Sequence, residues 1–225
     1  MAALLLAAAG FARLGVWQLS RLRQRQAENR VTLAARAAAP ARLTPDMMHA
    51  DTLAEHRVIA EGRYDSAHEV VLRGDVLDGT PGVRLVTPLL LTDSGPAVLV
   101  DRGFLPTPDG VTVDTRGARE AGVRTVRGIA LPFGTAPGEP VTHGDRTTWR
   151  RLDLNALRAR SPYPLLPIYI RQTPDSSLPS FPRRLEPPPV DEGPHLSYAI
   201  QWFLFAALAA GFAVLVVGRT GGVSG

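Results

Sequence analysis

The sequence of 225 residues contains no cysteine and no lysine. Without cysteine there are no disulfides, no thiolate metal sites and no cysteine nucleophile, although this absence says nothing about the compartment. Also missing are a phosphate-cradling glycine loop, a nucleophile elbow and the paired-histidine helix of zinc proteases. We therefore expect no enzymatic activity.

Charge is nearly absent from the two ends of the chain. All 21 acidic residues fall between Glu28 and Glu192, and of the 25 arginines only Arg13 and Arg219 lie outside positions 20–198. The middle thus holds 23 basic and 21 acidic residues, a net charge of +2. That balance argues against a nucleic-acid partner. The mean hydropathy of +0.01 is therefore an average of two apolar ends and a polar middle.

Each apolar end is long enough to span a bilayer. Ala2 to Leu19 and Ala199 to Gly218 are stretches of 18 and 20 residues, which as helices measure about 27 and 30 Å. A buried core helix is the alternative for the second stretch. A cleaved signal peptide is the alternative for the first, but it lacks a basic start and a small-residue cleavage site.

Trp17 ends the first span and Trp202 begins the second, so both indoles are expected at the membrane face nearest the middle domain. Arg219 favours a cytoplasmic C-terminus with the middle domain outside. Basic residues tend to stay on the cytoplasmic side of a membrane, so the arginines after the first span favour the reverse placement. That tendency weakens for long loops. We expect the outside placement, with the arginines near lipid headgroups.

The middle of the chain has the pattern of a β-rich domain. Short Val/Ile/Leu runs separated by Gly, Pro or Asp predict strands at His56–Gly62, His68–Arg73, Val83–Leu91, Ala97–Asp101, Val123–Leu131, Trp149–Leu154 and Leu165–Arg171. Residues 89–100 predict a hairpin that turns at Asp93–Pro96. Leu154–Arg160 predicts a short helix. The predicted fold is two transmembrane α-helices flanking an extracytoplasmic β-rich domain, a small antiparallel barrel or sandwich.

These patterns divide the chain into six segments. They are a transmembrane helix (1–19), a juxtamembrane helix (20–40), the β-rich domain (41–173), a proline-rich linker (174–194), a second transmembrane helix (195–218) and a cytoplasmic tail (219–225).

The most distinctive polar residue lies where the linker enters the membrane. His195, Tyr198 and Trp202 share one helix face by their spacing, and Trp17 and Gln18 of the other span are within reach of that face. A neutral imidazole there is a plausible axial ligand for heme iron. The alternative is an interfacial histidine that begins a helix.

Two other groups of residues are candidates for chemistry. Asp101-Arg102-Gly103 follows the hairpin strand, where an arginine can grip a carboxylate; alternatively, the arginine is paired locally and the glycine has a positive φ. Ser94, His143 and Asp145 are the scattered residues that a hydrolase would need.

Motifs along almost the whole chain resemble, in order, those of the Surfeit-locus family of cytochrome c oxidase assembly factors. The matching segments are Gly15-Val16-Trp17-Gln18-Leu19 with Arg21, Gly62-Arg63-Tyr64, Gly79 and Gly82, Thr87-Pro88-Leu89, Val98 to Pro106, and His195 to Phe203. The sequence departs from the family pattern at Asp101 and Phe104, where Asn and Trp are usual, and at Gly74-Asp75, where a basic residue is usual.

The resemblance implies a membrane factor that helps to deliver heme A to oxidase subunit I, or stabilises it there. It implies that His195 is a heme A ligand, with Trp17, Gln18, Tyr198 and Trp202 around it. We expect Arg21 or Arg102 to pair with the propionates. We expect Arg102, Gly103 and Phe104 to contribute to the partner-binding surface. The expected partners are subunit I, the heme A synthesis machinery and the lipid bilayer of the bacterial inner membrane. The alternative function is a membrane-tethered interaction module without heme.

Overall fold

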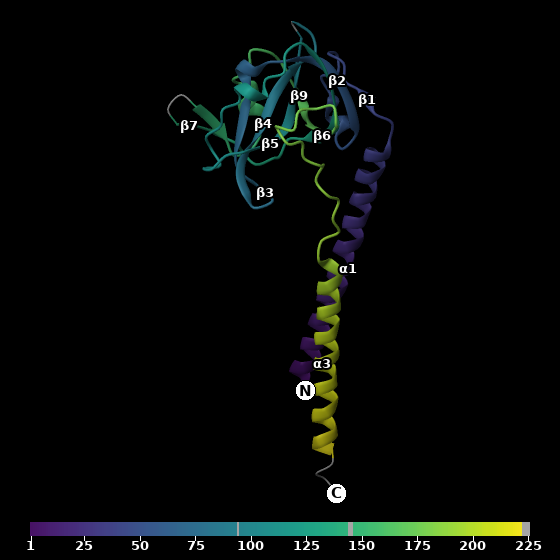
Figure 1. Ribbon diagram of the computed structural model, residues 1–225. Helices are drawn as coiled ribbons and strands as arrows, with labels where there is room; N and C mark the ends of the chain where they lie inside the picture. The colour runs from purple at the N-terminus through teal and green to yellow at the C-terminus, as the bar shows by residue number, and fades with distance from the viewer. Residues whose placement is uncertain (94, 144–145, 222–225) are drawn as a thin grey trace. The chain divides into compact units, whose positions relative to one another are not determined.

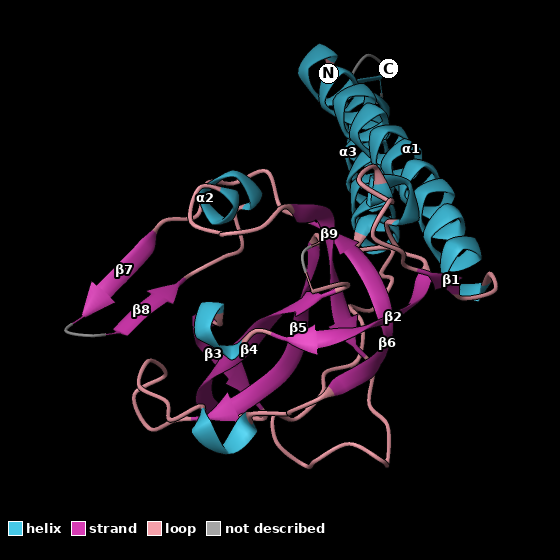
Figure 2. Cartoon of the chain, turned by 90° about the horizontal axis from the view of Figure 1, so that it is seen from above, coloured by secondary structure: helices cyan, strands magenta, loops and turns pink. Residues whose placement is uncertain are grey.

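A computed structural model of the protein describes residues 1–93, 95–143 and 146–221. Ser94 and Asp145 of the hydrolase alternative lie outside these residues. The chain divides into two compact units: a two-helix unit of Met1–Leu33 and Pro189–Gly225, and a β domain of Ala34–Pro188. Figure 1 traces the strands of the β domain, and Figure 2 separates helices from strands by colour.

The two-helix unit is built from α1 (Ala2–Ala37) and α3 (His195–Gly221), both long and apolar enough to cross a membrane. α1 is rich in Ala and Leu, which favour helix, and it ends shortly before Pro40. The helices lie side by side (Figure 2), and the rings of Phe11 and Trp202 stack at 5.7 Å between centroids. At Gly15 a β-carbon would lie 2.8 Å from the Phe203 ring, so glycine permits the close approach.

The β domain contains nine strands among its described residues. They are β1 (Ala41–Arg42), β2 (Arg57–Tyr64), β3 (Val70–Leu77), β4 (Thr80–Leu90), β5 (Ala97–Pro106), β6 (Val123–Pro132), β7 (Pro140–His143), β8 (Arg146–Trp149) and β9 (Leu165–Gln172). The helical turns are η1 (Ala50–Leu53), η2 (Ser66–His68), η3 (Arg116–Ala118) and α2 (Leu154–Arg158).

Five of the strands close into a barrel, which confirms the predicted fold class. The ring runs β2-β6-β9-β5-β4 and returns to β2 through the pairs Arg63↔Leu90 and Tyr64↔Leu89. All ring pairings are antiparallel except β5 with β9, which is parallel and was not foreseen. Closure removes the free edges that an open sheet of these strands would expose.

Alternation along the strands produces two cores, one on each side of the barrel wall. The first contains Val58, Ala60, Leu89, Val98, Val100, Val126, Ala130, Leu166, Ile168 and Ile170, with Leu43 and Ala50. The second lies under β3, β8 and α2 and contains Val70, Leu72, Val86, Ala97, Leu99, Trp149, Leu152, Leu157 and Leu165.

The structure confirms one predicted hairpin, contradicts one predicted strand and contains a hairpin that was not predicted. The β4–β5 hairpin is confirmed, with Leu90 opposite Ala97. The predicted strand at Trp149–Leu154 is wrong, because β8 ends at Trp149 and Asp153 caps α2 by accepting bonds from the Asn155 and Ala156 amides. A β3–β4 hairpin was missed although Asp78-Gly79, with φ of 51° and 77°, is a strong signal for its two-residue turn.

The chain enters and leaves the β domain at one clasp, formed by Arg36, Glu55 and Pro188. Arg36 donates to Glu55 Oε2 at 2.7 and 2.9 Å and to the Pro188 carbonyl at 2.8 Å. Arg57 donates to the carbonyls of Ala37 and Ala38, which end α1. The first and last segments of the domain are thereby held together.

Candidate functional site

His195 is the first residue of α3 and its ring is held from the other helix of the unit. The imidazole Nδ1 lies 2.9 Å from Oε1 of Gln18 on α1. A glutamine Oε1 can only accept a hydrogen bond, so Nδ1 carries the proton and donates it. In the neutral imidazole, a proton on Nδ1 leaves the lone pair on Nε2, the condition for a histidine that ligates a metal.

Gly193 lies beside the Nε2 edge of the imidazole, and a β-carbon there would be in ordinary van der Waals contact with the ring. Gly193 has a φ of 70°, and a β-carbon there would lie 3.6 Å from Nε2 and 3.5 Å from Cδ2 of His195. The preceding residues are tied to α1, since the Asp191 carbonyl accepts from Arg25 and Asn29, both at 3.1 Å. The last residues of the linker, which precede α3, therefore lie beside the imidazole.

A cavity of about 320 Å³ adjoins His195 within the two-helix unit. It is lined by Arg21, Gln24, Arg25, Glu28, Asp191, Glu192, Gly193 and His195. Arg25 reaches Glu28 at 3.5 Å, whereas Arg21 donates to Gln24 at 2.8 Å and forms no ion pair within the described ranges. Arg21 therefore retains donors for an anionic group, in a lining whose carboxylates outnumber its guanidinium groups.

The predicted aromatic residues are divided between two environments. Trp202 packs against Phe11 and meets Phe205 edge-on at 5.9 Å. Trp17 and Tyr198 are 52% and 46% exposed. The structure therefore brings His195 together with Gln18 and Arg21, leaves Trp17 and Tyr198 as open aromatic surfaces on α1 and α3, and uses Trp202 for packing between the helices.

Arg102 lies in the interior of the β domain, where a β-bulge directs it. In β5, Asp101 pairs with Val86 and Gly103 with Leu85, so Arg102 is the extra residue of the bulge. Its guanidinium is 2.6 Å from Glu120 Oε1 and lies 4.7 Å from the centre of the Tyr64 ring. It also bonds to the Ala118 carbonyl.

The electrostatics of this cluster are set by burial and by paired charges. Burial alone would raise the pKa of Glu120, but Arg102 and Arg184 outweigh it and hold that pKa below its ordinary value. Burial raises the pKa of Glu69, against hydrogen bonds from Thr115 and Thr87. The cluster is a compensated network of buried charge rather than an open site.

Gly103 and Phe104 are fixed by the chain segment that follows β9. Gly103 has a φ of 115°, and a β-carbon there would lie 2.2 Å from the Arg183 carbonyl oxygen. Phe104 is buried and exchanges two backbone hydrogen bonds of 2.8 Å with Arg183. The expected partner role of the Arg102 segment stays a prediction, and it would act through the surface that these residues support.

Asp101, one of the departures from the family pattern, is also buried. It accepts from Arg84 at 2.9 Å and from Arg171 at 3.3 Å, so its charge is compensated. Asp75 of the second departure pairs with Arg84 at 2.8 Å.

Sequence reasoning missed several members of both clusters. Around His195 these are Arg25, Glu28, Asp191 and Glu192, and around Arg102 they are Tyr64, Glu69, Glu120 and Arg184. The adjacent acids Asp191-Glu192, so close to an apolar span, were the available signal for the first group. The second group is scattered over 120 positions, and no local pattern marks it.

Comparisons with known proteins find relatives along almost the whole chain. Residues 5–207 match the SURF1 family. The chain is 26% identical to a SURF1-like protein of Monosiga brevicollis, over 94% of this chain and 85% of that protein. It is 26% identical to human Surfeit locus protein 1 over 86% of this chain and 69% of that protein. An uncharacterised SURF1-like protein of Mycobacterium bovis is 28% identical, over 88% and 74%.

Proposed function

This chain belongs to the SURF1 family, whose members are implicated in cytochrome c oxidase assembly, and from that premise we propose that it is a non-enzymatic assembly factor for this oxidase. Two helices able to span a bilayer would anchor it in the bacterial inner membrane, with the β domain on the extracytoplasmic side. Its partners would be subunit I and the machinery that makes heme A.

We further propose that the two-helix unit holds heme A through His195. The observation that carries this proposal is the hydrogen bond between Gln18 Oε1 and His195 Nδ1, because it orients the ring and, in the neutral imidazole, leaves Nε2 to ligate the iron. Arg21 would pair with a propionate, and Trp17 and Tyr198 would offer apolar surface to the macrocycle. When bound, heme A would be cargo for the oxidase, and the residues of this chain bind and orient it.

The first experiment is the absorbance spectrum of the full chain purified in detergent from cells that make heme A. We expect a stoichiometric heme spectrum, lost in His195→Ala and retained in His49→Ala, an exposed histidine of the β domain. Gln18→Leu should weaken heme retention by about tenfold, because the imidazole loses its orienting partner. Absence of stoichiometric heme, or a spectrum unaffected by His195→Ala, would rule out His195 as a ligand of the heme iron.

A second experiment separates assembly from heme binding. Deleting the gene should lower oxidase activity and the heme A content of the membranes, and the wild-type chain should restore both. If His195→Ala restores both as well, the protein acts as a membrane-tethered interaction module without heme. If the deletion changes neither quantity under any growth condition, the assembly function itself is wrong.

Partner binding needs its own measurement. Oxidase subunit I should co-purify with the tagged full chain, and the recovery should not depend on His195 if the β domain makes the contact. Subunit I that is recovered equally with an unrelated tagged membrane protein would contradict the proposed partner.

A further inference from the structure

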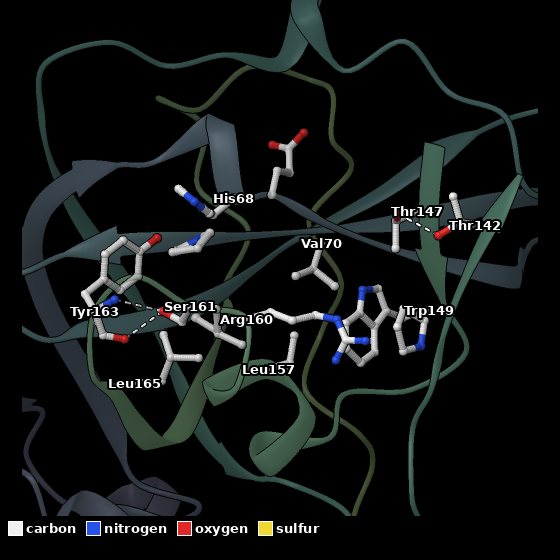
Figure 3. A pocket seen from close by; sticks show the side chains of 14 residues that line it. His68, Val70, Thr142, Thr147, Trp149, Leu157, Arg160, Ser161, Tyr163 and Leu165 are labelled. Carbon is white, nitrogen blue, oxygen red and sulfur yellow. Dashed lines mark hydrogen bonds between the residues drawn. The ribbon is translucent and has the colours of Figure 1, made fainter. Parts of the chain in front are cut away.

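A second cavity, of about 300 Å³, lies entirely within the β domain. Figure 3 shows it between the β7–β8 ribbon, which carries Thr142, Thr147 and Trp149, and the segment after α2, which carries Arg160, Ser161 and Tyr163. It shares no residue with the cavity beside His195. Whatever it binds is therefore independent of the heme proposal.

One wall of this cavity is a single face of the ribbon. β7 and β8 are antiparallel, with Pro140 opposite Trp149 and Thr142 opposite Thr147. Residues two apart on a strand point to the same side, so these four side chains form a continuous surface. The ribbon therefore provides an apolar end at Trp149 and a hydroxyl-bearing end at the two threonines.

The floor of the cavity is the second hydrophobic core. Val70, Leu99, Trp149, Leu157 and Leu165 all line the cavity, and each is less than 10% exposed. An apolar group that enters here loses its contact with water against side chains that are already packed. Burial of that kind favours binding by about 25 cal/mol for each Å² of apolar surface.

Arg160 is the charged group at this cavity whose charge is not compensated. Its guanidinium lies 5.7 Å from the centre of the Trp149 ring and donates one long hydrogen bond, of 3.3 Å, to the Ala156 carbonyl. It forms no ion pair among the residues that the structure describes. This cation–π contact leaves the other donors of the exposed guanidinium free.

Most other polar groups of the lining already have partners. His68 Nδ1 is 2.7 Å from Asp65, the Thr142 and Thr147 hydroxyls meet at 3.1 Å, and the Ser161 hydroxyl donates to the Tyr163 carbonyl at 2.6 Å. Glu69 accepts from the Thr87 hydroxyl at 3.0 Å. Open hydrogen-bonding capacity is thus concentrated at the fork of Arg160, which matches a carboxylate.

We propose that this cavity binds an apolar group that bears a carboxylate, such as the carboxyl-terminal residue of an extended peptide. The apolar group lies on Trp149, Leu157 and Leu165, and the carboxylate accepts two hydrogen bonds from Arg160. A free fatty acid offers the same chemistry, so the experiment includes one.

The test uses the full chain in lipid nanodiscs with Trp17→Phe and Trp202→Phe. Trp149 is then the one tryptophan of the 3 in the sequence, and its emission reports the cavity. The probes are acetyl-Ala-Ala-Leu with a free carboxylate, the same peptide as its amide, and octanoate. We expect saturable binding of the peptide acid and about tenfold weaker binding of the amide, the effect of losing hydrogen bonds to a charged group.

Two variants and a matched control test the residues. Arg160→Gln should weaken binding of the acid about tenfold and abolish its advantage over the amide, whereas Arg63→Gln, an exposed arginine on β2 outside the cavity, should change nothing. Thr147→Tyr should block binding by filling the cavity. Octanoate that binds more tightly than the peptide would assign the site to a free acid. Equal binding of acid and amide, no saturable change, or full binding by Arg160→Gln would overturn the proposal.

Discussion

Arg102 in the β domain and Arg21 in the two-helix unit carry the same guanidinium group in opposite circumstances. Arg102 is 1% exposed and is paired with Glu120, which also pairs with Arg184. Arg21 is exposed and contacts Gln24. The β domain buries a compensated network of charge beside its apolar cores, while the two-helix unit keeps polar donors exposed at one end.

The two units also treat a histidine differently. His68 in the β domain directs Nδ1 to the carboxylate of Asp65, and His195 directs Nδ1 to the neutral amide of Gln18. The Asp65 carboxylate also accepts from the Tyr163 hydroxyl, so His68 belongs to a local network of the β domain. His195 instead meets a neutral amide that comes from the other helix of its unit.

The largest effect should come from the charge inside the β domain. Arg102→Met leaves Glu69 without its buried cation and Glu120 with Arg184 alone, so we expect a loss of about 3 kcal/mol. The apparent Tm of the detergent-solubilised chain should fall by roughly 10 °C. Arg63→Met, at an exposed position, is the control and should alter Tm little. A stable Arg102→Met variant that fails to bind the oxidase would instead make Arg102 a partner residue.

Two glutamates of the same cluster should respond to pH in opposite directions. The folded-state pKa of Glu120 is lowered, so its carboxylate stabilises the fold at neutral pH, by about 2 kcal/mol relative to Glu120→Gln. That difference should shrink as the pH falls below 4.5, the ordinary value, toward the folded pKa. The folded-state pKa of Glu69 is raised, so the stability of wild type relative to Glu69→Gln should increase as the pH falls toward 4.5. Parallel slopes for the two variants would refute this assignment.

A smaller effect is expected where apolar packing holds the two-helix unit. Gly15→Leu forces the Phe203 ring away and should cost about 1–3 kcal/mol of helix–helix packing. When the other two tryptophans are replaced by Phe, the emission of Trp202 should shift to longer wavelength as its contact with Phe11 loosens. Gly10→Leu is the matched control, because nothing lies within 4 Å of a β-carbon there. Equal shifts in both variants would mean that Gly15 is not the contact.

The smallest effect should follow from Asp65→Asn. Burial raises the pKa of Asp65, but bonds from His68, Ala67 and Tyr163 outweigh it and leave the pKa lowered. The His68 side chain is 44% exposed, so solvent screening limits the cost of losing this pair to about 0.5 kcal/mol. The measurement is Tm near neutral pH against Asp51→Asn, an exposed control. A fall in Tm as large as that of Arg102→Met would contradict the contrast between the buried and exposed pairs.

The sequence was informative where one pattern repeats and uninformative where partners are distant. Long, mostly apolar stretches predict α3 and the first half of α1, and β-branched runs between turn residues predict most strands of the barrel. The scarcity of polar residues near the spans made His195 and Gln18 conspicuous, although 177 positions separate them. In contrast, the bulge that turns Arg102 inward and the pairing of β2 with β4 that closes the ring depend on three-dimensional register. The cavity near Arg160 was missed because its walls come from five separate segments.

The clasp of Arg36, Glu55 and Pro188 has a consequence for how this chain can be rearranged. Because the β domain begins and ends at one place, it is an insertion between two helical segments. Such an insertion can be exchanged as a unit: β domains traded between relatives at residues 34 and 188 should fold in their new hosts. A set of these chimaeras would show whether the β domain or the two-helix unit selects the proposed oxidase partner.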